Sequence, residues 1–162
     1  MNDFSFRTDE EISDIYNKYS DTIYRVALMM MKNPDDAQDA VQSAFIKLIN
    51  SKNHFETDEQ IKAWFIVTVR NICRDMLKSS WNTKRSDFEE AVQASQSSEN
   101  YGNGIWDMVA DLDEKYRLPI LLHYAEGYKT REIAKILGVT HGQIRTRIHR
   151  ARKQLKILFD EE

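Results

Sequence analysis

The clearest chemical signal in the sequence is positive charge gathered near its C-terminus. Residues 128–158 contain nine lysines and arginines and one acidic residue, whereas residues 1–62 contain seven basic and twelve acidic side chains. Arginine can hydrogen-bond to guanine edges in a major groove, and both cations can neutralise phosphates. This asymmetry predicts a nucleic-acid-binding C-terminal end, with a merely solvated basic helix as the alternative.

The spacing of these cations places them on one side of a helix. Four apolar residues recur at intervals of three and four positions and predict the buried side: Ile144, Ile148, Ala151 and Leu155. At about 100° per residue, the remaining positions divide into an exposed face, its flanks and the apolar edge. The exposed face carries Arg145, Thr146, His149, Lys153 and Lys156. Its flanks carry Arg150 and Arg152, and Arg147 lies nearer the apolar edge.

Capping residues define the unit that would carry this helix. Thr140 and Gln143 match a capping box, Gly138 lies in a three-residue break, and Thr130 is predicted to cap the preceding helix. Two short helices joined by a glycine-containing turn form a helix-turn-helix unit. A capped basic second helix behind such a turn favours DNA binding over a solvated surface.

No pattern in the sequence predicts a catalytic or metal site. The four histidines show no ligand spacing, one cysteine cannot supply a zinc cluster, and no glycine-rich phosphate loop is present. We therefore expect no enzyme activity, no cofactor and no small-molecule substrate.

The elements that position these residues are all predicted to be helices, because apolar positions recur every three or four residues without a strand pattern. In the first half, helices are expected at about residues 9–31 and 58–79, with another between them that starts at residues 33–36 and carries apolar residues up to Leu48. Asn33 and Pro34 mark the second start, and a Thr57–Gln60 capping box marks the third. In the last part, four short helices are expected. Asp113 is predicted to cap the second of these, Gly127 to end it, and Pro119 to lie within it.

A change of composition separates the two halves. Residues 79–104 contain six serines and two glycines, which predicts a flexible linker, with a short helix near Phe88 to Ala94. We expect two small helical domains at residues 1–80 and 105–162, joined by a linker at 81–104.

Length and hydropathy indicate where in the cell the protein is located. The chain has 162 residues, and its longest apolar run, Val26 to Met31, is far shorter than the roughly 20 residues of a membrane span. The acidic N-terminus has no apolar signal core, and the lone Cys73 cannot form an intrachain disulfide. A cytoplasmic protein is expected, with Cys73 a small buried hydrophobe rather than a redox sensor.

Three segments resemble one protein family in that family's order. Residues 130–152 resemble the promoter-reading helix-turn-helix of bacterial sigma factors of the extracytoplasmic-function (ECF) group. Residues 36–48 resemble that group's polymerase-binding helix, and residues 63–77 resemble its minus-ten recognition helix. The resemblance covers about residues 10–158. It implies a dissociable subunit of bacterial RNA polymerase that directs promoter-specific initiation.

The resemblance assigns polymerase binding to the second predicted helix. In the family this region docks on the clamp helices of the β′ subunit, and the β subunit is also a partner. The matching residues are Asp39, Gln42 and Phe45, with Val41 and Ala44 nearer the core. An acidic and apolar face can meet a basic coiled coil. Core packing is the alternative for Phe45, and Ser43 stands where the family commonly has glutamate.

The resemblance also assigns DNA contacts in both halves. Phe55, Asn71 and Asp75 match positions that capture an unpaired minus-ten base, since asparagine can read a base edge and an aromatic ring can stack. Trp64 and Phe65 are interpreted as core, while Arg70, Arg74 and Lys78 either line the DNA backbone or are solvated. The minus-thirty-five positions are Arg145, Thr146, His149 and Arg150, with Arg147 and Lys153 as backbone or structural partners.

The function predicted from all of this is an ECF-type sigma factor whose partners are core RNA polymerase, promoter DNA and an anti-sigma factor. Two alternatives remain at this stage. A helix-turn-helix repressor or activator would bind DNA without polymerase, usually at palindromic half-sites. A helical adaptor would bind an acidic partner through its basic tail. The segments at 36–48 and 63–77 favour the sigma factor, because a repressor does not require them.

Overall fold

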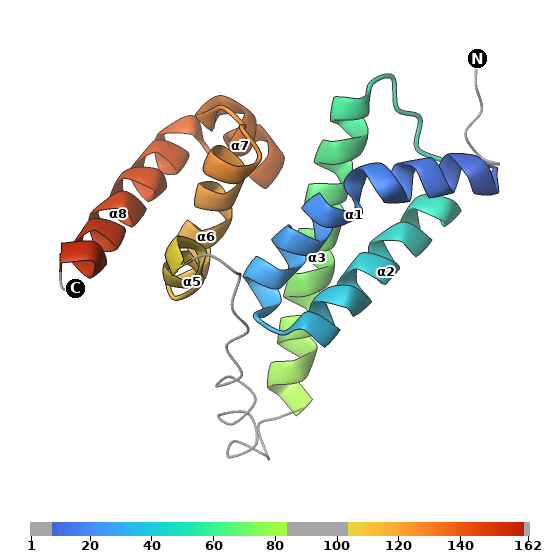
Figure 1. Ribbon diagram of the computed structural model, residues 1–162. Helices are drawn as coiled ribbons and strands as arrows, with labels where there is room; N and C mark the ends of the chain where they lie inside the picture. The colour runs from blue at the N-terminus through green and yellow to red at the C-terminus, as the bar shows by residue number, and fades with distance from the viewer. Residues whose placement is uncertain (1–7, 84–103, 161–162) are drawn as a thin grey trace. The chain divides into compact units, whose positions relative to one another are not determined.

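The computed structural model describes residues 8–83 and 104–160 (Figure 1). Throughout these residues the regular elements are helices, which confirms the all-α prediction. The chain divides into two compact units, Met1–Ser97 and Ser98–Glu162, called unit 1 and unit 2 below. The short helix expected near Phe88 to Ala94 lies outside the described residues.

Unit 1 is built from α1 (Asp9–Met31), α2 (Pro34–Asn50) and α3 (Asp58–Thr83), which pack against one another (Figure 1). All three begin where the sequence predicts. The α3 helix continues to Thr83, beyond the expected end at Ser79 and into the first residues of the predicted linker.

Local capping explains these starts. The backbone N–H of Asp36 donates to the Asn33 side chain at 3.1 Å, so Asn33 caps α2 as expected. At the start of α3, the Gln60 N–H donates to Thr57 Oγ1 at 3.2 Å. The Gln60 side chain accepts from the Glu56 N–H at 2.8 Å, one residue before the partner that a capping box would use.

Aromatic side chains form the centre of unit 1. Phe65 is fully buried, and its ring centroid lies 4.8 Å from that of Phe45 and 5.2 Å from that of Trp64. Tyr19 of α1 approaches the same ring at 6.1 Å. Phe65 is therefore core, as interpreted from the sequence, whereas Trp64 is half-buried at the edge of this cluster.

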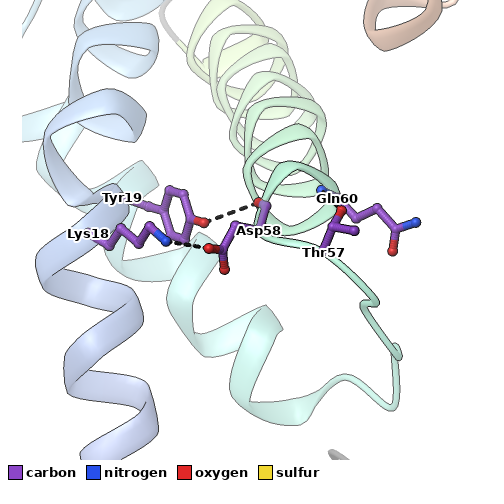
Figure 2. A network of polar contacts seen from close by, with 5 residues as sticks. All are labelled: Lys18, Tyr19, Thr57, Asp58 and Gln60. Atoms are coloured by element: carbon purple, nitrogen blue, oxygen red, sulfur yellow. Dashed lines mark hydrogen bonds and ion pairs between the residues drawn. The ribbon is translucent and has the colours of Figure 1, made fainter.

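The start of α3 is tied to α1 by two polar contacts (Figure 2). The Tyr19 hydroxyl donates to the Asp58 carbonyl at 3.1 Å, and Lys18 Nζ lies 2.5 Å from an Asp58 carboxylate oxygen. Partial burial raises the pKa of Tyr19, and the bond to Asp58 raises the pKa of Lys18. The ion pair is exposed and adds little stability. It instead helps to position Phe55, because Asp58 lies at the end of the segment that carries Phe55.

Cys73 lies on the inner side of α3, fully buried. Burial, with a smaller contribution from the charge of Asp36, raises the pKa of its thiol from 9.0 to about 12. The thiol is therefore protonated at neutral pH and is shielded from reagents, which agrees with its interpretation as a small hydrophobe.

This shift predicts slow alkylation of Cys73 in the folded chain. At pH 8 its thiolate fraction is about 10³-fold below that of an unfolded chain, so iodoacetamide should label the protein rapidly only in denaturant. Stability should also fall above pH 9, because the unfolded chain then loses the thiol proton that the folded chain retains to about pH 12. Intact-mass analysis measures the labelling of this single cysteine. Equal labelling rates in buffer and in urea would contradict the burial.

Unit 2 contains α5 (Gly104–Ala110), α6 (Glu114–Ile120), the π-helical turn η3 (Leu121–Ala125), α7 (Thr130–Leu137) and α8 (His141–Asp160). Pro119 cannot donate a backbone hydrogen bond and sits near the end of α6. Directly after it the chain widens into η3, where the Glu126 N–H donates to the Leu121 carbonyl at 3.3 Å. The predicted second helix is thus an α-helix followed by a π turn, and Gly127 follows with φ +75°.

Asp113 stands at the N-cap position of α6, as predicted, but its side chain makes no capping hydrogen bond. The cap predicted for α7 is wrong. Thr130 is the first residue of α7 rather than its cap, and the Lys129 N–H donates to Glu132 at 3.3 Å instead. The Thr130 hydroxyl is used in a tertiary contact with α8.

Candidate nucleic-acid interface

The helix-turn-helix of unit 2 is formed by α7, a tight turn and α8. Gly138 ends α7 in the left-handed region, with φ +68°, as the glycine at this break predicts. Thr140 and Gln143 then form the expected capping box: the Gln143 N–H donates to Thr140 Oγ1 at 3.1 Å, and the Thr140 N–H donates to Gln143 Oε1 at 3.0 Å. These bonds fix the residue at which α8 begins.

A side-chain contact across the turn joins the two helices. Thr130 Oγ1 at the start of α7 and His141 Nε2 at the start of α8 are 2.8 Å apart and hydrogen-bonded. The two helix starts are thereby held together. Thr130 makes this contact as the first residue of α7, one position after the cap residue Lys129.

The inner side of α8 is buried as predicted. Ile144 and Ala151 have no exposed surface, and Ile148 and Leu155 are also buried. Burying this stripe against α6 and α7 fixes how α8 is rotated about its axis. The opposite side must then face solvent.

The structure places the predicted minus-thirty-five residues together on this outer side. Arg145, Thr146, His149 and Arg150 are all exposed, as is Lys153. Arg147 is half-buried, in agreement with its predicted place at the apolar edge. A helix with this exposed cationic face and a firmly packed back can enter a major groove.

The predicted minus-ten residues lie along one face of α3. Asn71 and Asp75 are exposed and one turn apart. Phe55, in the segment before α3, packs edge-on against Trp64 with ring centroids 5.8 Å apart. Trp64 precedes Asn71 by two turns, or about 10 Å along the helix axis. Phe55, through its contact with Trp64, thus lies on the same side of α3 as Asn71 and Asp75. On the same helix, Arg74 and Lys78 are exposed and Arg70 is half-buried.

The predicted polymerase-binding residues on α2 separate into two groups. Asp39 and Gln42 are exposed. Phe45 is only 7% exposed, and its ring lies between those of Tyr16 (5.0 Å) and Phe65 (4.8 Å). This geometry favours the core alternative for Phe45, with Val41 and Ala44 buried beside it as expected.

Two residues on α2 were not foreseen as functional. Ile46 and Ile49 are 57% and 48% exposed, and with Asp39 and Gln42 they recur at intervals of three and four residues. The sequence carried a signal for them, because both isoleucines fall outside the stripe formed by Ala37, Ala44 and Leu48. Together the four residues form an exposed acidic and apolar face, called the α2 face below.

Over residues 8–83 and 104–160, no helix is long and apolar enough to cross a membrane. Within the same ranges, no three histidine, cysteine or acidic side chains are grouped as metal ligands would be.

Comparison with known proteins matches both units. The family model for sigma-70 region 2 matches residues 15–83, and that for sigma-70 region 4 matches residues 103–155. RNA polymerase sigma factor SigV of Bacillus subtilis is 30% identical over 141 residues, which cover 86% of this chain and 85% of that protein. ECF RNA polymerase sigma factor SigW of the same organism is 26% identical over 172 residues, covering 91% and 88%.

Solved structures show the same fold. Sigma factor RpoE from Bartonella quintana, in complex with the anti-sigma factor NepR, aligns with a TM-score of 0.73 at 20% identity, covering 93% of this chain and 98% of that one. CnrH, in complex with the cytosolic domain of CnrY, aligns with a TM-score of 0.68 at 21% identity, covering 96% and 91%. With both family models matched in order and a relative at 30% identity over most of its length, this chain belongs to the ECF group of the sigma-70 family of RNA polymerase sigma factors.

Proposed function

We propose that this sigma factor reads a promoter with two surfaces, one in each unit, and holds core RNA polymerase with a third. The observation that carries the proposal is the exposed cationic face of α8, set against a fully packed inner side. A helix-turn-helix alone would also suit a repressor. The match of residues 15–83 to sigma-70 region 2 supports a polymerase subunit instead.

In unit 2, α8 enters the major groove of the minus-thirty-five element. Arg145, Thr146, His149 and Arg150 reach base edges, while Arg147 and Lys153 contact the backbone. The arginines suit guanine, whose two acceptors match the guanidinium fork. Neutral His149 can donate or accept one hydrogen bond.

In unit 1, the face of α3 receives the minus-ten strand. Phe55, braced by Trp64, stacks on an unpaired base, and Asn71 and Asp75 contact neighbouring bases along the helix. Removing a base from the duplex costs a few kcal/mol, so a preformed aromatic surface lowers the cost of opening.

The third surface is the α2 face, which docks on the clamp helices of the β′ subunit. Its exposed carboxylate and isoleucines suit a partner that is basic and partly apolar. We assign polymerase binding and minus-ten reading to a domain at residues 1–80. Minus-thirty-five reading is assigned to a domain at 105–162, and residues 81–104 link the two domains.

Replacing Ile46 by aspartate should weaken binding to core polymerase about tenfold, or about 1.4 kcal/mol. A carboxylate there would be desolvated without a partner when the interface closes, while the fold is unaffected because Ile46 is largely exposed. Biolayer interferometry with immobilised core polymerase measures this. Asn17→Asp adds the same charge at an exposed position of α1 and is the matched control. Wild-type affinity for I46D would remove Ile46 from the interface.

The family are transcription regulators, and we propose that the chain acts in the cytoplasm with no catalysis of its own. RpoE was solved in complex with the anti-sigma factor NepR, and CnrH in complex with the cytosolic domain of CnrY, which supports an anti-sigma factor as a regulatory partner of this chain. Such a partner would cover the polymerase-binding or DNA-binding surfaces.

The test is run-off transcription on fragmented DNA from the source organism, with that organism's core polymerase in the presence or absence of the chain. New transcript starts that share a two-element upstream motif are expected. Binding to polymerase without new starts would favour an adaptor. Binding to duplex sites without polymerase would favour a repressor.

A further inference from the structure

Two clefts flank α8, one on each side of its outer face. Cleft 1 lies between α8, η3 and the start of α7, and its walls carry Arg145, His149 and Arg152 with His123 and Thr130. Cleft 2 lies between α8 and α6, and its walls carry Gln143, Arg147 and Arg150 with Lys115 and Tyr116. Gly142 and Thr146 line both clefts, so they mark the ridge that separates them.

Both clefts are cationic. The walls of cleft 1 contain the cations Arg145 and Arg152, and those of cleft 2 contain Lys115, Arg147 and Arg150. None of the residues that line either cleft is a carboxylate. Each cleft therefore offers an uncompensated positive surface that suits an anion.

Each cleft also has one cation placed against a tyrosine. In cleft 2, Lys115 Nζ lies 5.1 Å from the ring centroid of the buried Tyr116. Arg152, which lines cleft 1, lies over Tyr124 of η3, a residue outside the lining of that cleft, with Cζ 5.3 Å from the ring centroid, and its Nε–H donates to the Tyr124 hydroxyl. Such contacts restrict a long side chain before any ligand arrives, which lowers the entropy lost on binding.

Tyr124, which positions Arg152, is itself held in place by His123, a residue that lines cleft 1. The neighbouring His123 packs edge-on against Tyr124, with ring centroids 4.8 Å apart. His123 Nδ1–H donates to the Tyr128 carbonyl at 2.8 Å, which ties the end of η3 to the segment before α7. Arg152 thus reaches cleft 1 from α8 while its position is set by η3.

The arrangement matches the geometry of a duplex. A helix in a major groove has the phosphate backbone of one strand on each side, about 12 Å apart. We propose that the two clefts are phosphate sites, each for one strand, with Lys115 and Arg152 as ligands that act in addition to the base-reading residues. This inference rests on the proposed minus-thirty-five contact. It adds Lys115 of α6 to that contact, and it gives Arg152, which the sequence places on the flank of the basic face, a specific phosphate site.

The test compares holoenzymes made with full-length wild-type chain, Lys115→Gln and Arg152→Gln. Fluorescence anisotropy measures their binding to labelled promoter duplex at several salt concentrations. Each variant should reduce the magnitude of the negative slope of log K against log salt by about 1, because each removes one phosphate contact. The loss of affinity should be the same on a promoter whose minus-thirty-five bases are changed. The double variant should lower the slope by about 2.

Lys135→Gln is the matched control, since Lys135 is an exposed cation of α7 that lines neither cleft. An equal drop with K135Q would mean a general charge effect and would overturn the proposal. An unchanged salt slope in either K115Q or R152Q would also overturn the proposal. A loss of affinity confined to the native minus-thirty-five sequence would do so too, because it would indicate base reading. Failure of the wild-type holoenzyme to bind the promoter would contradict the proposed function itself, and the clefts with it.

Discussion

Replacing Phe65 by alanine is expected to lower the free energy of unfolding of unit 1 by about 3–5 kcal/mol. The side chain is fully buried and contacts the rings of Phe45, Trp64 and Tyr19, which come from all three helices of the unit. Its removal leaves a cavity where these helices meet, and the aromatic neighbours cannot refill it without moving the helices. The loss is comparable to the whole stability of a small domain.

Hydrogen exchange measured by mass spectrometry can assign this effect to one unit. Amides of α3 should exchange about 10²- to 10⁴-fold faster in F65A under conditions where exchange reports global opening. Amides of α8 are the internal control, because α8 lies in the other compact unit. Phe65→Leu leaves a smaller cavity and should give a smaller acceleration. Unchanged exchange of α3 in F65A would contradict the central place of this ring.

The helix starts were predictable because their causes are local. Asn33 and Pro34 specify the start of α2 through contacts within four residues of the chain, and Gly138 and Thr140 do the same between α7 and α8. Capping and glycine geometry need no knowledge of the tertiary fold. The buried side of α8 was equally predictable from the sequence, because its four apolar residues at helical spacing all lie on one side of the helix.

The failures concern contacts between distant segments. Thr130 has the side chain of a cap, but it lies one residue inside α7, and its hydroxyl bonds to His141, eleven residues away. Phe45 lies on the border of the buried stripe of α2, so periodicity could not decide between core and surface. Tyr16 and Phe65, from two other helices, decide it.

The candidate site shows the same division. The exposed face of α8 could be listed from its spacing, because one helix carries it all. The clefts beside it could not, because Lys115 lies on α6 and His123 on η3. The π turn at η3 follows Pro119. The effect of this proline on the backbone depends on which hydrogen-bond partners the next residues find, and the spacing of apolar residues does not reveal those partners.

Replacing Arg150 by alanine is expected to reduce discrimination at one minus-thirty-five base by about 1–3 kcal/mol. The side chain is exposed on the flank of α8 beside the ridge residue Thr146, where a guanidinium can reach the edge of a guanine. The loss should appear only for the native base at that position. The native and substituted promoters should become equal in their affinity for the R150A holoenzyme at that base pair.

Lys153→Ala separates base reading from charge. Lys153 is exposed on the same helix and is assigned a contact with the DNA backbone. Its loss should therefore weaken binding to all promoters equally and reduce the magnitude of the salt slope by about 1. Competition binding of the holoenzyme to promoters substituted singly across the minus-thirty-five element measures both variants. If R150A behaved as K153A is expected to, with uniform weakening and intact preference at each base, Arg150 would be a phosphate ligand of cleft 2. Base reading by α8 would then depend on Arg145, Thr146 and His149, the remaining residues on and beside the ridge.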